Sequence, residues 1–334
     1  YKALSNYGTR ISFVCNDTNE YMNLFDRCRM EPKDTAGRGL CVIDKRIMEF
    51  QTALCVEGDK EYIRVENIKK EINVCNQKYP TQHAVPIPVV PEIIRFSTIK
   101  ADNTLYKNNY RVPMGIRYST VQYTMLDLTS IGLIATLGRE KSGRTNFVKH
   151  MMSAIQTNLF GSITEAYVID NPERTLQDIK KYGFVERYTV DITELADIVA
   201  DIEKKLVERQ EAVLNDSSYS LEDEPLLLLV IENSKLFEHL QTSKELSTKI
   251  IQMLKQYKKY KFAIVLSEIE NANVPFNAPD FMKYVKENKK FVYFDEISTV
   301  KFFDVTARQQ KENAKPLKTG DAFVCLNGEV ERIK

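Results

Sequence analysis

Long hydrophobic runs are missing from this sequence. A helix needs about 20 consecutive apolar residues to cross a bilayer, and no run in the 334 residues approaches that length. The polar first residues, Tyr1 to Asn6, do not resemble a signal peptide. Because 43% of the residues are hydrophobic and can form a core, we expect a soluble, globular, cytosolic protein. Any membrane anchor of the whole molecule would lie outside this chain.

An excess of charge of one sign is missing as well. The chain has 47 basic and 46 acidic residues, so their charges nearly cancel. Proteins that hold the phosphate backbone of DNA or RNA usually carry a basic excess or a basic face. Nucleic acid is therefore not expected as a partner, although a local basic patch stays open.

Clustered metal ligands are missing too. The six cysteines never form a Cys-x-x-Cys pair, and the three histidines, His83, His150 and His239, are widely separated. Structural zinc sites use about four closely spaced ligands, so none is expected. Five of the six cysteines lie in the first quarter of the chain, often in apolar stretches. We interpret them as reduced core thiols rather than disulfides.

Prolines cluster in one region of the chain. Pro80, Pro86, Pro88 and Pro91 fall within twelve residues. Proline fixes φ and has no amide hydrogen, which favours an extended connector. We therefore expect three parts, which are residues 1–80, a proline-rich extended linker over 81–111, and a domain over 112–334.

A short sequence similarity relates residues 1–80 to residues 112–334. The glycine turn and strand from Gly37 to Asp44 are similar to those from Thr319 to Gly328, which suggests that residues 1–80 close another copy of the same domain. Two ordinary glycine turns before strands would look the same. Both interpretations stay open at this point.

Strand and helix patterns alternate after the prolines. The run from Leu226 to Ile231 is apolar without interruption, as expected of a central strand covered on both faces. The alternation predicts an α/β fold with a mostly parallel sheet flanked by helices on both faces. Strands are predicted at 10–15, 39–43, 50–56, 110–118, 131–137, 165–170, 226–232 and 262–267, and helices at 19–28, 61–79, 145–159, 173–181 and 193–214, with further helices up to residue 260.

The segment from Gly138 to Thr145 has the glycine spacing of a phosphate-binding P-loop. It follows a predicted strand and opens a predicted helix, which is the order that such a loop requires. Arginine stands at position 144, where a P-loop usually has a lysine that reaches the phosphates. The planar guanidinium of arginine is bulkier than the ammonium of lysine. Weak binding of ATP with Mg²⁺ is therefore predicted. A glycine turn before an ordinary helix would look similar. The residues expected to contact a nucleotide are Gly138, Arg139, Glu140, Lys141, Ser142, Gly143, Arg144, Thr145 and Asn146.

An acidic residue at the end of a buried strand would complete a magnesium site. Glu232 ends the predicted strand at 226–232 and, with the Thr145 hydroxyl, would hold Mg²⁺. At the next position, where an acid would activate the attacking water, stands Asn233, and a neutral amide cannot accept a proton. Little or no hydrolysis is therefore predicted. In the alternative interpretation, Glu232 only marks a strand end that enters solvent.

Two further residues are candidates for contacts with a bound nucleotide. Ser267 ends the predicted strand at 262–267, where a polar side chain could sense a γ-phosphate, although serine is common at strand ends. Arg209, on the predicted helix at 193–214, could project into an adjoining subunit as an arginine finger. A solvated helix face would also explain Arg209. Asp170 is interpreted as a residue that starts a helix rather than as a ligand.

With these residues placed, the chain resembles the FtsK/SpoIIIE-type ATPases, and among them the EssC/EccC-type coupling ATPases of type VII secretion. The resemblance implies a RecA-like P-loop NTPase fold, in which residues 112–334 are the terminal, degenerate ATPase domain and residues 1–80 are the closing section of a preceding FtsK-like domain. Besides the P-loop, the resemblance rests on residues 8–14, 37–40, 85–92, 112–116 and 121–127.

For function, the resemblance implies a cytosolic location beneath a bacterial membrane anchor, hexameric assembly with other ATPase domains of the same polypeptide, and WXG100-type secretion substrates as partners. The terminal domain would receive the C-terminal signal of a substrate in an apolar pocket. The first alternative is an ATP-hydrolysing motor for protein secretion, in which Arg144 and Glu232 still serve and another acid replaces Asn233. The second is a DNA translocase of the FtsK type, which the nearly neutral charge disfavours.

Overall fold

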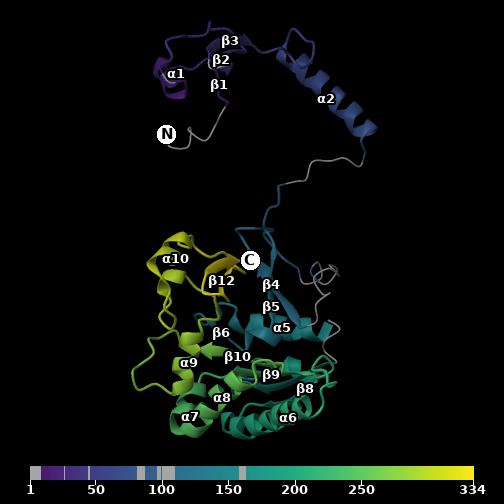
Figure 1. Cartoon of the computed structure of the whole chain (residues 1–334), viewed down its shortest axis with the longest axis vertical. Helices are drawn as coiled ribbons and strands as arrows, with labels where there is room; N and C mark the ends of the chain where they lie inside the picture. The colour runs from purple at the N-terminus through teal and green to yellow at the C-terminus, as the bar shows by residue number, and fades with distance from the viewer. Residues whose placement is uncertain are drawn as a thin grey trace. The chain divides into compact units, whose positions relative to one another are not determined.

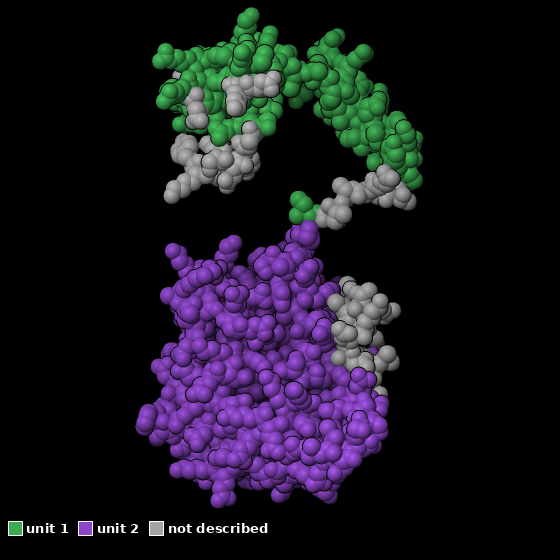
Figure 2. Space-filling view, in the orientation of Figure 1, with its two compact units in different colours: residues 1–87 green, residues 88–334 purple. Residues whose placement is uncertain are grey.

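The structure is a computed structural model of the chain, and it contains two compact units, Tyr1–Ile87 and Pro88–Lys334 (Figure 2). Their boundary falls within the region predicted as a linker, 81–111. Because residues 81–86 and most of 96–109 lie outside the described part of the chain, the extended form of this linker stays a prediction. The structure describes residues 9–25, 27–43, 46–80, 87–95, 99, 110–157 and 163–334.

The first unit contains a small antiparallel sheet in the order β1-β2-β3. Its few buried apolar side chains include Tyr21, Phe25 and Leu40. The strand predicted at 50–56 is wrong in position, since β3 begins at Arg46, which pairs with Ile43 of β2. The elements are β1 (Ile11–Phe13), α1 (Thr18–Leu24), β2 (Arg38–Ile43), β3 (Arg46–Gln51) and α2 (Glu61–Lys78).

All six cysteines are free thiols. Cys28 and Cys325 are buried, as predicted for core thiols. Cys55 and Cys75 are exposed, because the segment that carries them lies outside the small core of the first unit. The interpretation as core thiols is therefore wrong for these two residues.

The second unit is built on an eight-stranded sheet in the order β13-β12-β11-β6-β10-β9-β7-β8 (Figure 1). The six strands from β11 to β8 in this order pair in parallel, and β12 and β13 add an antiparallel hairpin at one edge. The mostly parallel sheet predicted from the sequence is thus confirmed. The strands are β6 (Leu133–Leu137), β7 (Thr164–Ile169), β8 (Val185–Thr189), β9 (Leu226–Glu232), β10 (Phe262–Ile269), β11 (Phe291–Tyr293), β12 (Ala322–Cys325) and β13 (Val330–Ile333), with a separate pair, β4 (Arg111–Ile116) and β5 (Tyr123–Asp127).

Helices cover both faces of this sheet. On β9, Leu227, Leu229 and Ile231 belong to one apolar cluster, while the alternate residues Leu226 and Leu228 belong to the other. This explains the unbroken apolar run, because a strand exposes alternate side chains to opposite faces. In Figure 1, α6, α7 and α8 lie on one side of the sheet and α5 on the other. The helices are α4 (Leu128–Ile131), α5 (Arg144–Thr157), α6 (Leu195–Asn215), α7 (Leu236–Thr242), α8 (Lys244–Gln256), α9 (Asp280–Asn288) and α10 (Ala307–Glu312).

Some predicted elements differ from the structure. The helix predicted at 173–181 is only a short 3₁₀ helix, Gln177–Lys181, because the Asp170 carboxylate accepts hydrogen bonds from the amides of Asn171 and Leu176 and shapes a turn there. Strand β8, which follows this turn, was not predicted. The predicted end of α5 at residue 159 lies outside the described residues. Within the described residues, no helix is both long and apolar enough to cross a bilayer.

Asp321 connects the C-terminal hairpin, β12 and β13, to Tyr118, which follows β4. Its buried carboxylate accepts hydrogen bonds from Tyr118 Oη at 3.0 Å and the Lys318 amide at 2.9 Å, and it also binds the guanidinium of Arg332. Lys334 Nζ lies 3.4 Å from the same carboxylate. Burial alone would raise the pKa of Asp321, but these hydrogen bonds lower it below its ordinary value.

We expect Asp321→Asn to lower the free energy of unfolding by about 3 kcal/mol at pH 7, because it leaves two buried cations without their anion. Since the folded-state pKa is depressed, the contribution of the carboxylate is complete above the ordinary aspartate pKa of about 4 and is lost as the pH falls further. Urea unfolding curves should therefore show the two proteins converging below about pH 4. The control, Asp304→Asn, changes an exposed pair with Lys286 and should cost less than about 1 kcal/mol; equal losses would contradict the expectation.

Candidate nucleotide site

The loop at Gly138 joins β6 to α5 at the carboxyl edge of the parallel strands. Gly138 has a backbone φ of 150° and Gly143 a φ of 118°. Residues other than glycine rarely adopt such values. A Cβ on Gly138 would lie 2.6 Å from Ser142 Oγ and 3.0 Å from Phe294 Cβ. The glycine spacing seen in the sequence therefore corresponds to a tight cradle that closes only without side chains at these positions.

The end of the loop forms the start of α5. Arg144 is the first residue of the helix, so the backbone amides of its first turn have no partner within the helix and can donate to an anion. Lys141 has a left-handed backbone with a φ of 60°, and Arg139 forms an ion pair with Asp295 at 3.5 Å. The P-loop thus ends in free amides at the start of α5, which fit a phosphate group.

Thr145 and Glu232 meet as the sequence predicts for a magnesium site. Thr145 Oγ1 donates to Glu232 Oε1 at 2.5 Å, and Glu232 is fully buried. The alternative in which Glu232 enters solvent is therefore wrong. Burial raises the pKa of Glu232, against the smaller lowering effect of the Thr145 hydrogen bond.

Two side-chain atoms at this site lack a partner. Among the described residues, three buried side-chain polar atoms have no hydrogen bond, and two of them are Ser142 Oγ and Glu232 Oε2. Buried polar atoms in native proteins are almost always satisfied, so their place at the P-loop indicates a ligand. A nucleotide with Mg²⁺ fits these residues, because Ser142 can donate to a phosphate oxygen and Glu232 can bind the cation.

Asn233 has a structural role. Its side chain is buried, its Nδ2 donates to the carbonyl of Asp170 at 3.1 Å, and its Oδ1 accepts from the Lys235 amide at 3.0 Å. These bonds tie the end of β9 to the end of β7. Both ends of the amide thus bind groups within the protein, and a neutral amide cannot serve as a base.

Ser267 is buried in the sheet beside Glu232. The two residues are register partners on β10 and β9, and the Ser267 hydroxyl accepts a hydrogen bond from Thr136 Oγ1 at 2.8 Å. Ser267 therefore lies next to the magnesium-site carboxylate, at the carboxyl end of the strand. Contact between Ser267 and a γ-phosphate stays a prediction.

Arg209 is placed differently from its predicted role. Its side chain is 4% exposed, its Nε forms an ion pair with Glu224 at 2.9 Å, and its Nη1 donates to the carbonyl of Tyr260 at 3.0 Å. This burial contradicts the expectation that Arg209 projects into an adjoining subunit. The helical periodicity of the sequence could not show that Arg209 is buried, because its partners Glu224 and Tyr260 lie outside this helix.

Glu268 was missed by the sequence analysis. It follows Ser267 on β10, is half-buried, and accepts a hydrogen bond from Asn171 Nδ2 at 2.9 Å. Burial raises the pKa of Glu268, while the Asn171 hydrogen bond and the charge of Arg144 lower it. The available signal was an acid directly after the predicted strand end, but the sequence could not tell that its side chain meets Asn171.

The chain is similar to type VII secretion proteins over almost its whole length. The type VII secretion system protein EssC of Staphylococcus aureus (strain MRSA252) is 21% identical to it over 334 residues, which cover 99% of this chain and 21% of EssC. No protein-family model matches the chain. The resemblance to EssC/EccC that the sequence motifs predicted is thus confirmed, for a chain that spans about a fifth of that relative.

Solved structures agree with this comparison. The structure of EssC ATPases 2 and 3 from Geobacillus thermodenitrificans superposes with a TM-score of 0.63 at 19% identity and covers 99% of this chain and 61% of that one. Thermomonospora curvata EccC ATPases 2 and 3, in complex with a signal sequence peptide, give a TM-score of 0.55 at 16% identity, with 91% of this chain and 54% of that one covered. At such identities the likeness establishes the fold, and the predicted P-loop NTPase fold is confirmed.

The burial of Arg209 leads to a stability prediction. Arg209→Ala should lower the free energy of unfolding by about 3 kcal/mol, because it removes the buried cation that pairs with Glu224 and donates to the Tyr260 carbonyl. Arg308→Ala is the matched control, since Arg308 is 85% exposed and pairs with Glu312; it should cost less than about 1 kcal/mol. Urea denaturation measures both. An Arg209→Ala protein of unchanged stability would argue against the internal role.

Proposed function

We propose that this chain is an ATPase-like part of a type VII secretion coupling protein, which recruits WXG100-type substrates, binds ATP with Mg²⁺ weakly and hydrolyses it little or not at all. The observation that carries the proposal is a complete P-loop scaffold with altered catalytic positions, Arg144 and Asn233. In the full assembly, the chain would act with other ATPase domains of its polypeptide, as a hexamer on the cytoplasmic face of the membrane, through an anchor outside this segment. Nucleic acid is not an expected partner.

Nucleotide binding would use the groups already close to one another. Amides at the start of α5 and the Ser142 hydroxyl would donate to phosphate oxygens, and Thr145 with Glu232 would hold Mg²⁺. A bound Mg²⁺ would neutralise charge on the phosphates. Arg144 would reach the same space with a planar fork instead of a compact ammonium, which is the reason for weak affinity.

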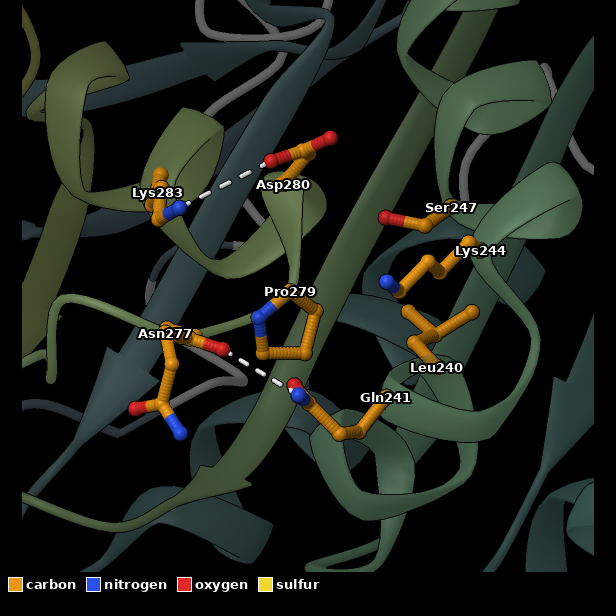
Figure 3. A pocket seen from close by; sticks show the side chains of 9 residues that line it. Leu240, Gln241, Lys244, Ser247, Asn277, Pro279, Asp280 and Lys283 are labelled. Atoms are coloured by element: carbon orange, nitrogen blue, oxygen red, sulfur yellow. Dashed lines mark hydrogen bonds and ion pairs between the residues drawn. The ribbon is translucent and has the colours of Figure 1, made fainter.

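Substrate recruitment would use the loop 274–279 together with α9, which we call the docking surface. This loop separates two hollows of about 310 and 450 Å³, and Lys283 of α9 lines both. Figure 3 shows the smaller hollow, where Gln241 reaches the loop at Asn277. The smaller hollow is lined by Leu240, Gln241, Lys244, Ser247, Asn277, Ala278, Pro279, Asp280 and Lys283, and the larger by Val274, Pro275, Phe276, Lys283, Lys286, Glu287, Lys289 and Asp304.

Phe276 is the most exposed large apolar side chain of this surface. It is 98% exposed, and Lys283 Nζ lies 5.9 Å from its ring centroid. Exposed aromatic residues next to a hollow commonly act as anchors for partner proteins. The neighbouring Val274 and Pro275 extend the apolar area, so the surface suits an amphipathic signal segment. The EccC structure with a bound signal sequence peptide supports a role of this kind.

A second candidate function is an ATP-hydrolysing motor that drives protein secretion. It is favoured by Glu268, an acid on β10 that accepts a hydrogen bond from Asn171 at the same edge of the sheet as Glu232. This alternative needs Glu268 to take part in hydrolysis.

Arg144→Lys should tighten the binding of ATP with Mg²⁺ by about tenfold, or about 1.4 kcal/mol, because an ammonium fits between two phosphates better than a guanidinium. Isothermal titration calorimetry with and without Mg²⁺ measures the change. Arg308→Lys makes the same change at an exposed position of α10, outside the P-loop, and should leave the affinity nearly unchanged. No gain for Arg144→Lys would mean that the arginine does not limit binding.

Phe276→Ala should weaken the binding of a WXG100-type C-terminal signal peptide by at least about tenfold, which corresponds to a loss of more than 1 kcal/mol at an anchor position. Fluorescence anisotropy of the labelled peptide measures this. Leu214→Ala is the control, because Leu214 is an exposed apolar residue of α6 that lines neither hollow. Equal affinity of all three proteins would exclude the docking surface, and no binding in any nucleotide state would remove substrate recruitment from the proposal.

A further inference from the structure

The hydrogen bond between Asn171 and Glu268 crosses the end of a strand. Glu268 belongs to β10 and Asn171 follows β7, and β9 lies between these two strands in the sheet. Neighbouring strands are about 4.8 Å apart, so β10 and β7 are separated by about twice that distance. A side-chain contact of 2.9 Å between them therefore has to form above the carboxyl end of β9. That strand ends at Glu232 and is followed by Asn233.

The backbone of β10 is deformed where this crossing begins. Glu268 has a left-handed φ of 58°, which is uncommon for a residue with a side chain. The pairing of β10 with β6 shifts register between Leu266 and Ile269, as in a β-bulge. Bulges beside functional sites commonly turn a side chain toward the site. Here the deformation turns Glu268 toward β9, while Ser267 keeps its regular place in the ladder opposite Glu232.

Glu268 is electrostatically coupled to Arg144 of the P-loop and to Glu232. After burial and the Asn171 hydrogen bond, the charge of Arg144 is the next influence on the pKa of Glu268. Burial is the main cause that raises the pKa of Glu232, and the negative charge of Glu268 adds to it. The contact with Asn171 above the end of β9 and these two influences agree in assigning Glu268 to the same edge of the sheet as Arg144 and Glu232.

We propose that Glu268 supplies the carboxylate that position 233 lacks, and that it accepts a proton from the water that attacks the γ-phosphorus of bound ATP. The water oxygen forms a bond to the γ-phosphorus, and the bond from that phosphorus to the β–γ bridging oxygen breaks. ADP leaves with the electron pair of the broken bond. The proton passes to Glu268 and then to solvent, so no further reactant is needed. The proposal rests on the nucleotide-binding part of the proposed function.

The arrangement explains how the site can keep an acid although Asn233 is neutral. Asn233 uses its side chain to join β9 to β7, and Asn171 at the end of β7 holds Glu268 in return. The structural amide and the acid are thus parts of one network. Hydrolysis stays slow in this scheme, because Arg144 is a poor substitute for the lysine that stabilises charge on the phosphates.

Glu268→Gln in the full 334-residue chain tests the proposal. The variant keeps an oxygen that can accept from Asn171, so the network is retained while the base is removed. Phosphate release from ATP with Mg²⁺ should fall by about a hundredfold or more. The affinity for ATP with Mg²⁺, measured by calorimetry, should stay within about threefold or become tighter, because a negative charge near the phosphates is removed.

A second measurement does not depend on turnover. The wild-type chain should bind ADP with aluminium fluoride and Mg²⁺, a mimic of the transferring phosphoryl group with its attacking water, more tightly than ADP alone, and Glu268→Gln should lose this preference. Glu270→Gln is the matched control, since it removes a carboxylate from an exposed position two residues further along the chain. It should leave phosphate release and the preference unchanged.

Three outcomes would overturn the role of Glu268. The first is equal phosphate release by the wild-type and Glu268→Gln proteins, and the second is a wild-type chain that binds ATP with Mg²⁺ but releases no phosphate. The third is a wild-type chain that does not bind ATP with Mg²⁺, which would also remove the nucleotide part of the proposed function. Substrate recruitment fails separately, because the signal peptide experiment measures binding at a different surface.

Discussion

The burial of β9 on both faces is the constraint on which the rest of this structure depends. All seven residues from Leu226 to Glu232 are buried, so apolar layers have to cover the strand on each side. Parallel strands β10 and β7 flank it, and the helices that connect these strands form the two layers. This arrangement brings the carboxyl ends of six parallel strands to one edge of the sheet, and the P-loop follows one of them, β6.

The same burial sets the chemistry of that edge. A carboxylate at the end of a fully covered strand is costly unless hydrogen bonds or a cation compensate it. Thr145 Oγ1 donates a hydrogen bond to Glu232 Oε1, while Glu232 Oε2 has no hydrogen-bond partner. Its raised pKa follows mainly from burial, and a bound divalent cation would satisfy it. The P-loop therefore faces a buried carboxylate that has one oxygen without a partner, and a second acid, Glu268, lies on the neighbouring strand β10.

Much of the fold and part of the site could be predicted from the sequence. The glycine spacing indicated a cradle, and the structure shows why, since a Cβ on Gly138 would collide with Ser142. The meeting of Thr145 and Glu232 followed from the rule that parallel strands end at one edge. Strand β8 was missed because it is a polar edge strand with a mixed burial pattern. Arg209 was misread because its helical spacing says nothing of Glu224, which lies in a loop before β9.

The sequence by itself determined the local conformations: the unbroken apolar strand, the glycine turn and the helix that follows it, because these depend on neighbouring residues. Only the tertiary structure decided which distant side chains meet. Asn171 and Glu268 are 97 positions apart, and their contact depends on the strand order and on a bulge in β10. Backbone deformation of this kind is stabilised by packing and hydrogen bonds from other strands, and no short segment of sequence contains those partners.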